Sequence, residues 1–282
     1  MRVELADDRW HDLRSSLAAA TDRFTGLLLA PGERDRRVGR WRSGEIAAHV
    51  AVVAHLNAGF LRAPSAPTGH PLIDRLVRTS SLGDIGHLND VALREHPERS
   101  PSVLAERLRD GVGLLLDRSA DLDPLAPARW LGGATLPAAS LVAHMLNEVL
   151  LHGHDLARAR SLPWRLPSRE AGLAFDLFLV SLLGGTDRGC LFGPGAGQGR
   201  VIRIEFRSPH TTPVVLVTGG GRIGADPPGG RVDARVRFEP GALMLAAFRR
   251  VSLSRAVATG RIVATGRRPW AAATYVRGMN TP

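Results

Sequence analysis

The sequence predicts an N-terminal up-down four-helix bundle followed by a C-terminal α+β domain. Apolar residues recur at helical spacing through residues 5–160, with no convincing strand among them. The segment 161–167, S-L-P-W-R-L-P, then contains two prolines that make it a stiff connection. After one further helix, apolar and polar residues alternate as they do in β-strands. We therefore expect two domains, residues 1–162 and residues 163–282.

Four helices are expected before the connection, and most have a recognisable beginning or end. Pro31-Gly32 ends the first helix. Glu45 lies in the first turn of the second, where the helix dipole favours a carboxylate. Ser100-Pro101 begins the third, with proline in the first turn, where its missing N–H is tolerated. The predicted ranges are 5–29, 43–62, 101–120 and 137–160.

The segment between the second and third helices, residues 63–100, is rich in Pro, Gly, Ser and charged residues. We expect a long connection there, with at most a short helix around 71–80. Long connections are often functional, so this one could lie over the mouth of a site. It contains His70, His87 and His96, which we expect to be solvated.

The C-terminal domain is expected to begin with a helix over 168–184 and to continue mainly with strands. The runs V-I-R-I-E-F-R and V-D-A-R-V-R-F alternate between apolar and polar residues, as half-buried strands do. Strands followed by helices and a last strand indicate an α+β domain. The predicted strands span 201–207, 213–218, 232–238 and 261–265, and the short helices span 241–249 and 253–258.

The charge of the chain is strongly basic, with a formal net charge of +10. All 37 Lys and Arg positions are Arg, and they are spread along the 282 residues without a long basic block. This distribution favours a solvated basic surface over a nucleic-acid-binding patch. The absence of lysine excludes Schiff-base chemistry by the protein.

Cysteine and hydropathy restrict the class of protein further. Cys190 is the only cysteine, so neither an intrachain disulfide nor a cysteine metal cluster can form. It lies in a glycine-rich loop with no histidine beside it, so we do not expect a catalytic thiol.

No apolar run reaches transmembrane length, and the N-terminus lacks the apolar core of a signal peptide. We expect a soluble cytoplasmic protein that does not bind membranes; its oligomeric state is not indicated.

The run A-H-M-L-N-E-V-L-L-H-G-H-D in the fourth predicted helix contains a possible metal-binding pair. Glu148 and His152 are four residues apart, so their side chains lie one turn apart on the same face. Asp155 follows one turn later, and His144 precedes by one turn. A carboxylate and an imidazole placed in this way can share a divalent metal ion, but they also fit a surface ion pair.

A metal site would need a third ligand from another segment. His49 lies on or beside the apolar stripe of the second predicted helix, where a histidine is usually a satisfied core residue. The need for a third ligand makes it the candidate. His55 lies off this stripe and is expected at the surface.

Three segments together resemble a known family. They are W-R-S-G-E-I-A-A-H-V at 41–50, E-V-L-L-H-G-H-D-L at 148–156, and the tail 232–266. The first two look like the metal-binding helices of the mycothiol-dependent maleylpyruvate isomerases, in the DinB-like bundle superfamily. The tail resembles the sterol-carrier-protein-like domain that follows the bundle in that family. Residues 63–135 match no motif of the family.

The resemblance implies roles for particular residues. The metal ligands would be His49, Glu148 and His152. Asp155 would be an outer partner of the site or a helix-end contact, and His144 an outer partner or an alternative ligand. The catalytic residues implied by the resemblance include an arginine of the tail, best matched by Arg250, with Arg249 adjacent.

The function implied is that of a metal-dependent enzyme using a low-molecular-weight thiol, mycothiol in this family. Zinc is the expected metal, and an open coordination position would accept the thiol sulfur and stabilise its thiolate. The thiolate would attack a small electrophilic substrate, and Arg250 would bind its carboxylate. Release of the thiol after rotation gives isomerisation, whereas a lasting adduct gives thiol transfer.

Two alternatives stay open on the sequence. A metal-dependent hydrolase would bind water in place of the thiol. A non-catalytic protein would use the metal only for stability and would bind an apolar ligand in its C-terminal domain.

Overall fold

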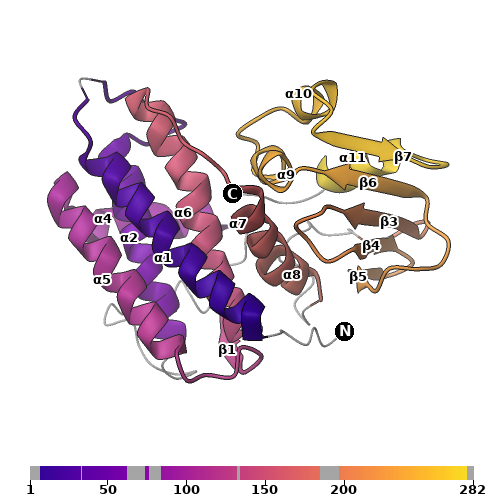
Figure 1. The fold of residues 1–282 in the computed structure, drawn as a ribbon, viewed down its shortest axis with the longest axis horizontal. Helices are drawn as coiled ribbons and strands as arrows, with labels where there is room; N and C mark the ends of the chain where they lie inside the picture. Colours follow the sequence, from indigo (N-terminus) through magenta and orange to yellow (C-terminus); the bar gives the residue numbers. More distant parts are fainter. Residues whose placement is uncertain are drawn as a thin grey trace. The chain divides into compact units, whose positions relative to one another are not determined.

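The computed structural model describes residues 7–32, 34–61, 74–75, 84–131, 134–184 and 197–277. The chain forms two compact units, one of Leu5–Leu166 and one made mainly of Pro167–Pro282. The first unit is mainly helical, and the second contains a five-stranded sheet (Figure 1). The predicted fold class, a helical part followed by an α+β part, is confirmed.

Four long helices form the first unit and agree with the predicted ones to within a few residues. Helices α1 and α2 each pack against both α5 and α6, which gives the four-helix arrangement. The four helices are α1 (Asp7–Leu29), α2 (Ser43–Phe60), α5 (Pro101–Ser119) and α6 (Ala138–Arg160).

Two local features of this unit were not predicted. Helix α4 (Ile85–Glu95) occupies part of the expected long connection, and His87 lies on it rather than in a loop. It forms because Leu88, Val91 and its neighbours are buried at helical spacing. The strands β1 (Pro127–Arg129) and β2 (Thr135–Pro137) pair as an antiparallel hairpin, too short to show alternation in the sequence. His70 and most of the short helix predicted at 71–80 lie outside the described residues.

Two carboxylates fix the beginning of α2. The Asp35 carboxylate accepts a hydrogen bond from the backbone N–H of Ser43 (3.0 Å), and that of Glu45 accepts one from the N–H of Arg42 (2.8 Å). Both bonds satisfy backbone donors that would otherwise be unpaired at a helix start. The helix thereby begins in one defined orientation, which sets the direction of His49 one turn after Glu45.

Helix α6 is the central element of the first unit, because 18 of its 23 residues are buried. Part of its surface is covered by the segment predicted to be a stiff connection. The Trp164 indole N–H donates to the Leu150 carbonyl (3.0 Å), and the ring meets that of Phe24 edge-on at 6.5 Å. The same ring lies over Gly153, where a Cβ would overlap it. This packing explains why the first unit extends to Leu166.

The second unit is built on a sheet in the order β5-β4-β3-β6-β7. Strand β3 pairs antiparallel with β4 and parallel with β6, while the outer pairs are antiparallel. The aromatic rings of Phe175, Phe206 and Phe238 meet at centroid distances of 5.0–6.2 Å and form part of the core. The strands are β3 (Ile202–Arg207), β4 (Val214–Gly219), β5 (Arg222–Asp226), β6 (Ala234–Phe238) and β7 (Ile262–Thr265).

The helices of the second unit agree in part with the prediction. The single helix expected over 168–184 is interrupted by a π-helical turn, η3 (Phe175–Leu179), between α7 (Ser168–Ala174) and α8 (Val180–Gly184). Strand β5 and helix α11 were not predicted; β5 carries only one large apolar side chain, Ile223. No helix among the described residues combines the length and apolar character needed to cross a membrane. The remaining helices are α9 (Pro240–Ala247), α10 (Leu253–Ala258) and α11 (Trp270–Arg277).

Candidate metal centre

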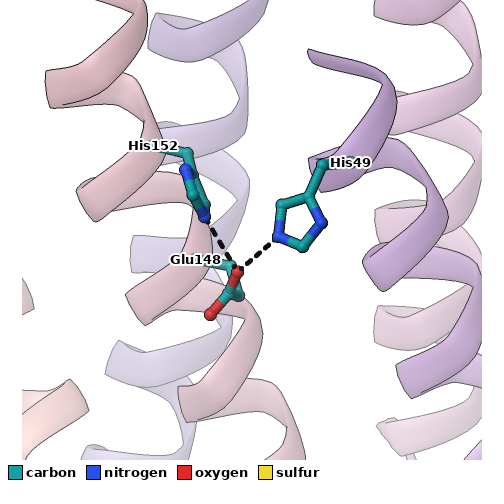
Figure 2. A group of neighbouring side chains, drawn as sticks. All are labelled: His49, Glu148 and His152. Carbon is teal, nitrogen blue, oxygen red and sulfur yellow. Dashed lines mark hydrogen bonds and ion pairs between the residues drawn. The ribbon is translucent and has the colours of Figure 1, made fainter. Parts of the chain in front are cut away.

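Three possible metal ligands converge inside the first unit. His49 comes from α2, and Glu148 and His152 come from neighbouring turns of α6 (Figure 2). One ligand atom from each residue lies within 4.8 Å of the others. Glu148 Oε2 is 3.2 Å from His49 Nε2 and 3.4 Å from His152 Nε2. The two histidines are 6% exposed, so the cluster is largely withdrawn from solvent.

The set suits a tetrahedrally coordinated ion. Two imidazoles and one carboxylate are a common donor set for catalytic zinc, which keeps its fourth position open. Donor atoms about 2.1 Å from a tetrahedral zinc ion lie about 3.4 Å from one another. The two distances from Glu148 Oε2 agree with this spacing. The residues present therefore fit a zinc ion.

An aromatic ring covers one side of both histidines. The Trp41 ring lies 4.8 Å from the His49 ring and 5.8 Å from the His152 ring, measured between centroids. Trp41 lies two residues before the start of α2 at Ser43 and is held by a backbone bridge to Val38. It packs on both rings and so restricts their movement.

The cluster shifts the pKa values of its members in different directions. Burial raises the pKa of Glu148, but hydrogen bonds from His144, His152 and His49 outweigh it and hold the pKa well below 4.5. Burial lowers the pKa of His49 from 6.5. Burial also opposes the charged form of His152, yet the Asp155 and Glu148 carboxylates raise its pKa. At neutral pH the cluster thus contains an ionised Glu148 and a neutral His49, the forms that bind metal.

Two further residues on α6 contact the cluster from outside. Asp155 Oδ2 lies 3.3 Å from His152 Nδ1, the nitrogen that faces away from Glu148. A carboxylate in this place orients a metal-binding imidazole. His144 Nε2 lies 3.5 Å from Oε1 of Glu148, not from the oxygen that faces the other two histidines. His144 is therefore an outer neighbour of the three-residue cluster.

Several residues of the site could not be identified from the sequence. Two of them contact His144. The Trp130 ring lies 5.5 Å from the His144 ring between centroids, and Asn57 Oδ1 lies 3.2 Å from His144 Nδ1. The only sequence signal for Asn57 is an amide in an apolar part of α2. His55 is exposed, as predicted.

The two tail arginines lie at the end of α9. Arg249 is exposed and has a left-handed backbone (φ 59°), and the N–H of Arg250 donates to the carbonyl of Leu245 (2.8 Å). This is a Schellman helix end with arginine where glycine is usual. The Arg250 guanidinium donates to the carbonyl of Phe248 (2.9 Å). Arg249 and Arg250 lie in the second unit, and His49, Glu148 and His152 in the first. Cys190 lies outside the described residues.

Comparisons with known proteins agree with the fold of the chain. A family model described as "Mycothiol maleylpyruvate isomerase N-terminal domain" matches residues 10–157. The solved structure of a mycothiol-dependent maleylpyruvate isomerase is similar, with a TM-score of 0.53 and 15% identity over 91% of this chain and 92% of that one. A mutant of that isomerase gives a TM-score of 0.52 with the same identity and coverage. At this identity, the structural similarity shows the fold alone. No curated protein matches the sequence significantly.

Proposed function

Because the chain belongs to the mycothiol maleylpyruvate isomerase N-terminal domain family, whose model covers more than half of it, we propose that it is a metal- and thiol-dependent enzyme. Its reaction would be cis–trans isomerisation of a small acidic electrophile, or thiol transfer to one. The expected location is the cytoplasm, and the expected partners are a small thiol and a small substrate. A sterol-carrier-protein-like second domain is part of the same proposal.

The observation that carries the proposal is the buried convergence of two imidazoles and one carboxylate. His49, Glu148 and His152 would hold a divalent ion, with zinc the best match to this donor set. When bound, the ion supplies a positive charge that stabilises a coordinated thiolate near neutral pH. Three protein donors leave a coordination position for this thiol, whereas a purely structural zinc site uses four.

The chain's own residues would prepare the site for an external thiol. Glu148 supplies the negative charge of the set, and His49 is kept neutral by burial. The Asp155 carboxylate lies against Nδ1 of His152, while Nε2 points toward the cluster. Trp41 shields the two imidazoles.

Arg250 is the proposed substrate-binding residue of the second unit. Its planar guanidinium matches a carboxylate, and part of the side chain is exposed. Arg249 is the weaker choice for substrate binding. It occupies the left-handed position at the end of α9, and this structural role accounts for its conformation.

The thiolate would attack an electrophilic double-bond carbon of the substrate, forming a carbon–sulfur bond and placing the electron pair on the conjugated carbonyl oxygen. Rotation about the carbon–carbon bond, now single, followed by return of that pair and expulsion of the thiolate gives the isomer. If the enolate formed by the addition is protonated on carbon instead, the thiol adduct remains.

A single assay series tests this proposal. The zinc-loaded protein is mixed with mycothiol and maleylpyruvate, and substrate and product are separated by chromatography. We expect turnover that requires both thiol and metal, and loss of metal and turnover in His152→Ala, since removal of one of three donors opens the site. His55→Ala, at the exposed face of α2, is the matched control and should keep both.

The outcomes separate the proposal from its alternatives. Conversion without thiol, with water incorporated into the product, would indicate a hydrolase. Zinc retained in His152→Ala would contradict the ligand assignment. Zinc bound without conversion of maleylpyruvate or of other acidic electrophiles would support the non-catalytic alternative.

A further inference from the structure

The two carboxylate oxygens of Glu148 have different partners. Oε2 faces His49 and His152, at 3.2 and 3.4 Å from their Nε2 atoms. Oε1 instead lies 3.5 Å from His144 Nε2. Because Glu148 and His144 are four residues apart on α6, the helix itself brings them together. The oxygen that faces His49 and His152 is thus distinguished from the other one, which faces His144.

His144 is in turn held by residues outside its own helix. Its Nδ1 lies 3.2 Å from Asn57 Oδ1, on α2. The ring of Trp130, in the β1–β2 segment, meets it edge-on at 81°. Asn57 and Trp130 are each 1% exposed, and the Asn57 amide nitrogen also contacts the Met145 sulfur at 3.7 Å. His144 therefore has little freedom to turn away from Glu148.

We propose that His144 is a positioning residue that keeps Glu148 a one-oxygen ligand. By occupying Oε1 it directs Oε2 alone toward the metal. A carboxylate without such a partner can swing or bind through both oxygens, which would use the coordination position needed by the thiol. Hydrogen-bonded neighbours of metal ligands commonly orient them in this way. The inference rests on the proposed metal site and adds Asn57 and His144 to it.

Zinc affinity of the full-length protein, measured by competition with a chromophoric chelator, tests this arrangement. We expect His144→Leu to bind zinc about 10- to 100-fold more weakly, the usual loss when such a neighbour is removed. His144→Gln, whose amide can still reach Oε1, should recover most of the affinity. His55→Leu, an exposed histidine on α2, is the control and should bind like the parent protein.

Cobalt provides a readout that a general loss of stability would not change. Bound Co²⁺ absorbs visible light with an intensity that falls as its coordination number rises. A second oxygen from Glu148 in His144→Leu should weaken this absorption per bound cobalt, whereas His144→Gln should retain it. An unchanged cobalt spectrum in His144→Leu would overturn the inference, and so would unchanged zinc affinity.

A double-mutant cycle tests the role of Asn57. If Asn57 acts through His144, Asn57→Leu should weaken zinc binding in the parent protein but have almost no further effect in His144→Leu. Additive losses would show that Asn57 acts independently and would contradict its action through His144.

If the parent protein fails to bind zinc, the proposed function itself fails. If His152→Ala abolishes binding but His144→Leu does not weaken it, only this inference fails.

Discussion

His49 and His152 face the same carboxylate oxygen, yet their pKa values shift in opposite directions. Burial lowers the pKa of His49, whereas the Asp155 and Glu148 carboxylates outweigh burial at His152 and raise its pKa above 6.5. In the metal-free protein, the raised pKa of His152 stabilises the fold below its unfolded pKa, and this contribution disappears as pH rises through the folded value. The depressed pKa of Glu148 has the opposite effect: it stabilises above the unfolded pKa, and this is lost as pH falls through the folded value.

Metal binding should consequently depend on the proton of His152. A proton on this imidazole competes with the metal, so we expect apparent zinc affinity to fall as pH falls through the raised pKa of His152, beginning above 6.5. The loss should approach about tenfold per pH unit for one displaced proton. Chelator competition between about pH 6 and pH 8 measures it. Asp155→Asn should move the onset to lower pH, and equal affinity across this range would contradict the assignment.

At the scale of elements, the packing of Trp164 on α6 depends on a glycine. Gly153 lies in a helix interior, where alanine is normally favoured by up to about 1 kcal/mol. A Cβ there would overlap the Trp164 ring, so we expect Gly153→Ala instead to lower the free energy of unfolding by about 1–3 kcal/mol. Gly113→Ala on α5 is the matched control, because a Cβ there meets nothing within 4 Å. Denaturant unfolding measures both variants, and a stabilising Gly153→Ala would contradict the packing of Trp164.

Elements with strong periodicity were predictable, and those formed by tertiary contacts were not. The apolar stripes of α1, α2, α5 and α6 are long enough to determine a helical period without other information. Helix α4 has a short stripe and β1 only three residues, so their formation depends on neighbouring elements. The π-helical turn η3 also has no signature in spacing alone.

In the candidate metal site, sequence spacing predicted one pair of ligands, whereas the contacts with other elements became visible only in the structure. Glu148 and His152 could be paired because one helical turn separates them. His49 was a candidate because a third ligand was needed, and the resemblance to a family implied its role; spacing could not, since 99 residues separate it from Glu148. The ring contacts of Trp41 and the contact between His144 Nδ1 and Asn57 Oδ1 depend on how α2 packs on α6, which periodicity does not determine.

At the scale of the whole molecule, the proposed function assigns substrate binding to Arg250 of the second unit. We expect Arg250→Ala to lower turnover by about a hundredfold, the scale of lost substrate positioning, with zinc content unchanged. Arg250→Lys should rescue poorly, because an ammonium cannot replace a bidentate fork. Steady-state kinetics with elemental analysis measures these effects.

The control for this experiment is Arg255→Ala, an exposed arginine in the first turn of α10. It removes the same charge from the second unit and should leave turnover unchanged. Arg249→Gly tests the role of Arg249 separately from that of Arg250. Glycine suits the left-handed backbone at this position and should also stabilise the helix end by about 1 kcal/mol. Loss of turnover in Arg249→Gly with activity retained in Arg250→Ala would assign the substrate contact to Arg249 instead.

His49 lies on α2 and Glu148 on α6, so an ion bound to both would affect the chain between these helices. An ion held by His49 and Glu148 would act as a cross-link that closes a loop of about a hundred residues, containing α4 and α5. Because the unfolded chain lacks the site, the ion binds the folded protein alone, and the free energy of unfolding rises with the logarithm of free metal concentration. The persistence of the whole bundle at high temperature would then be set by metal supply as well as by its apolar core.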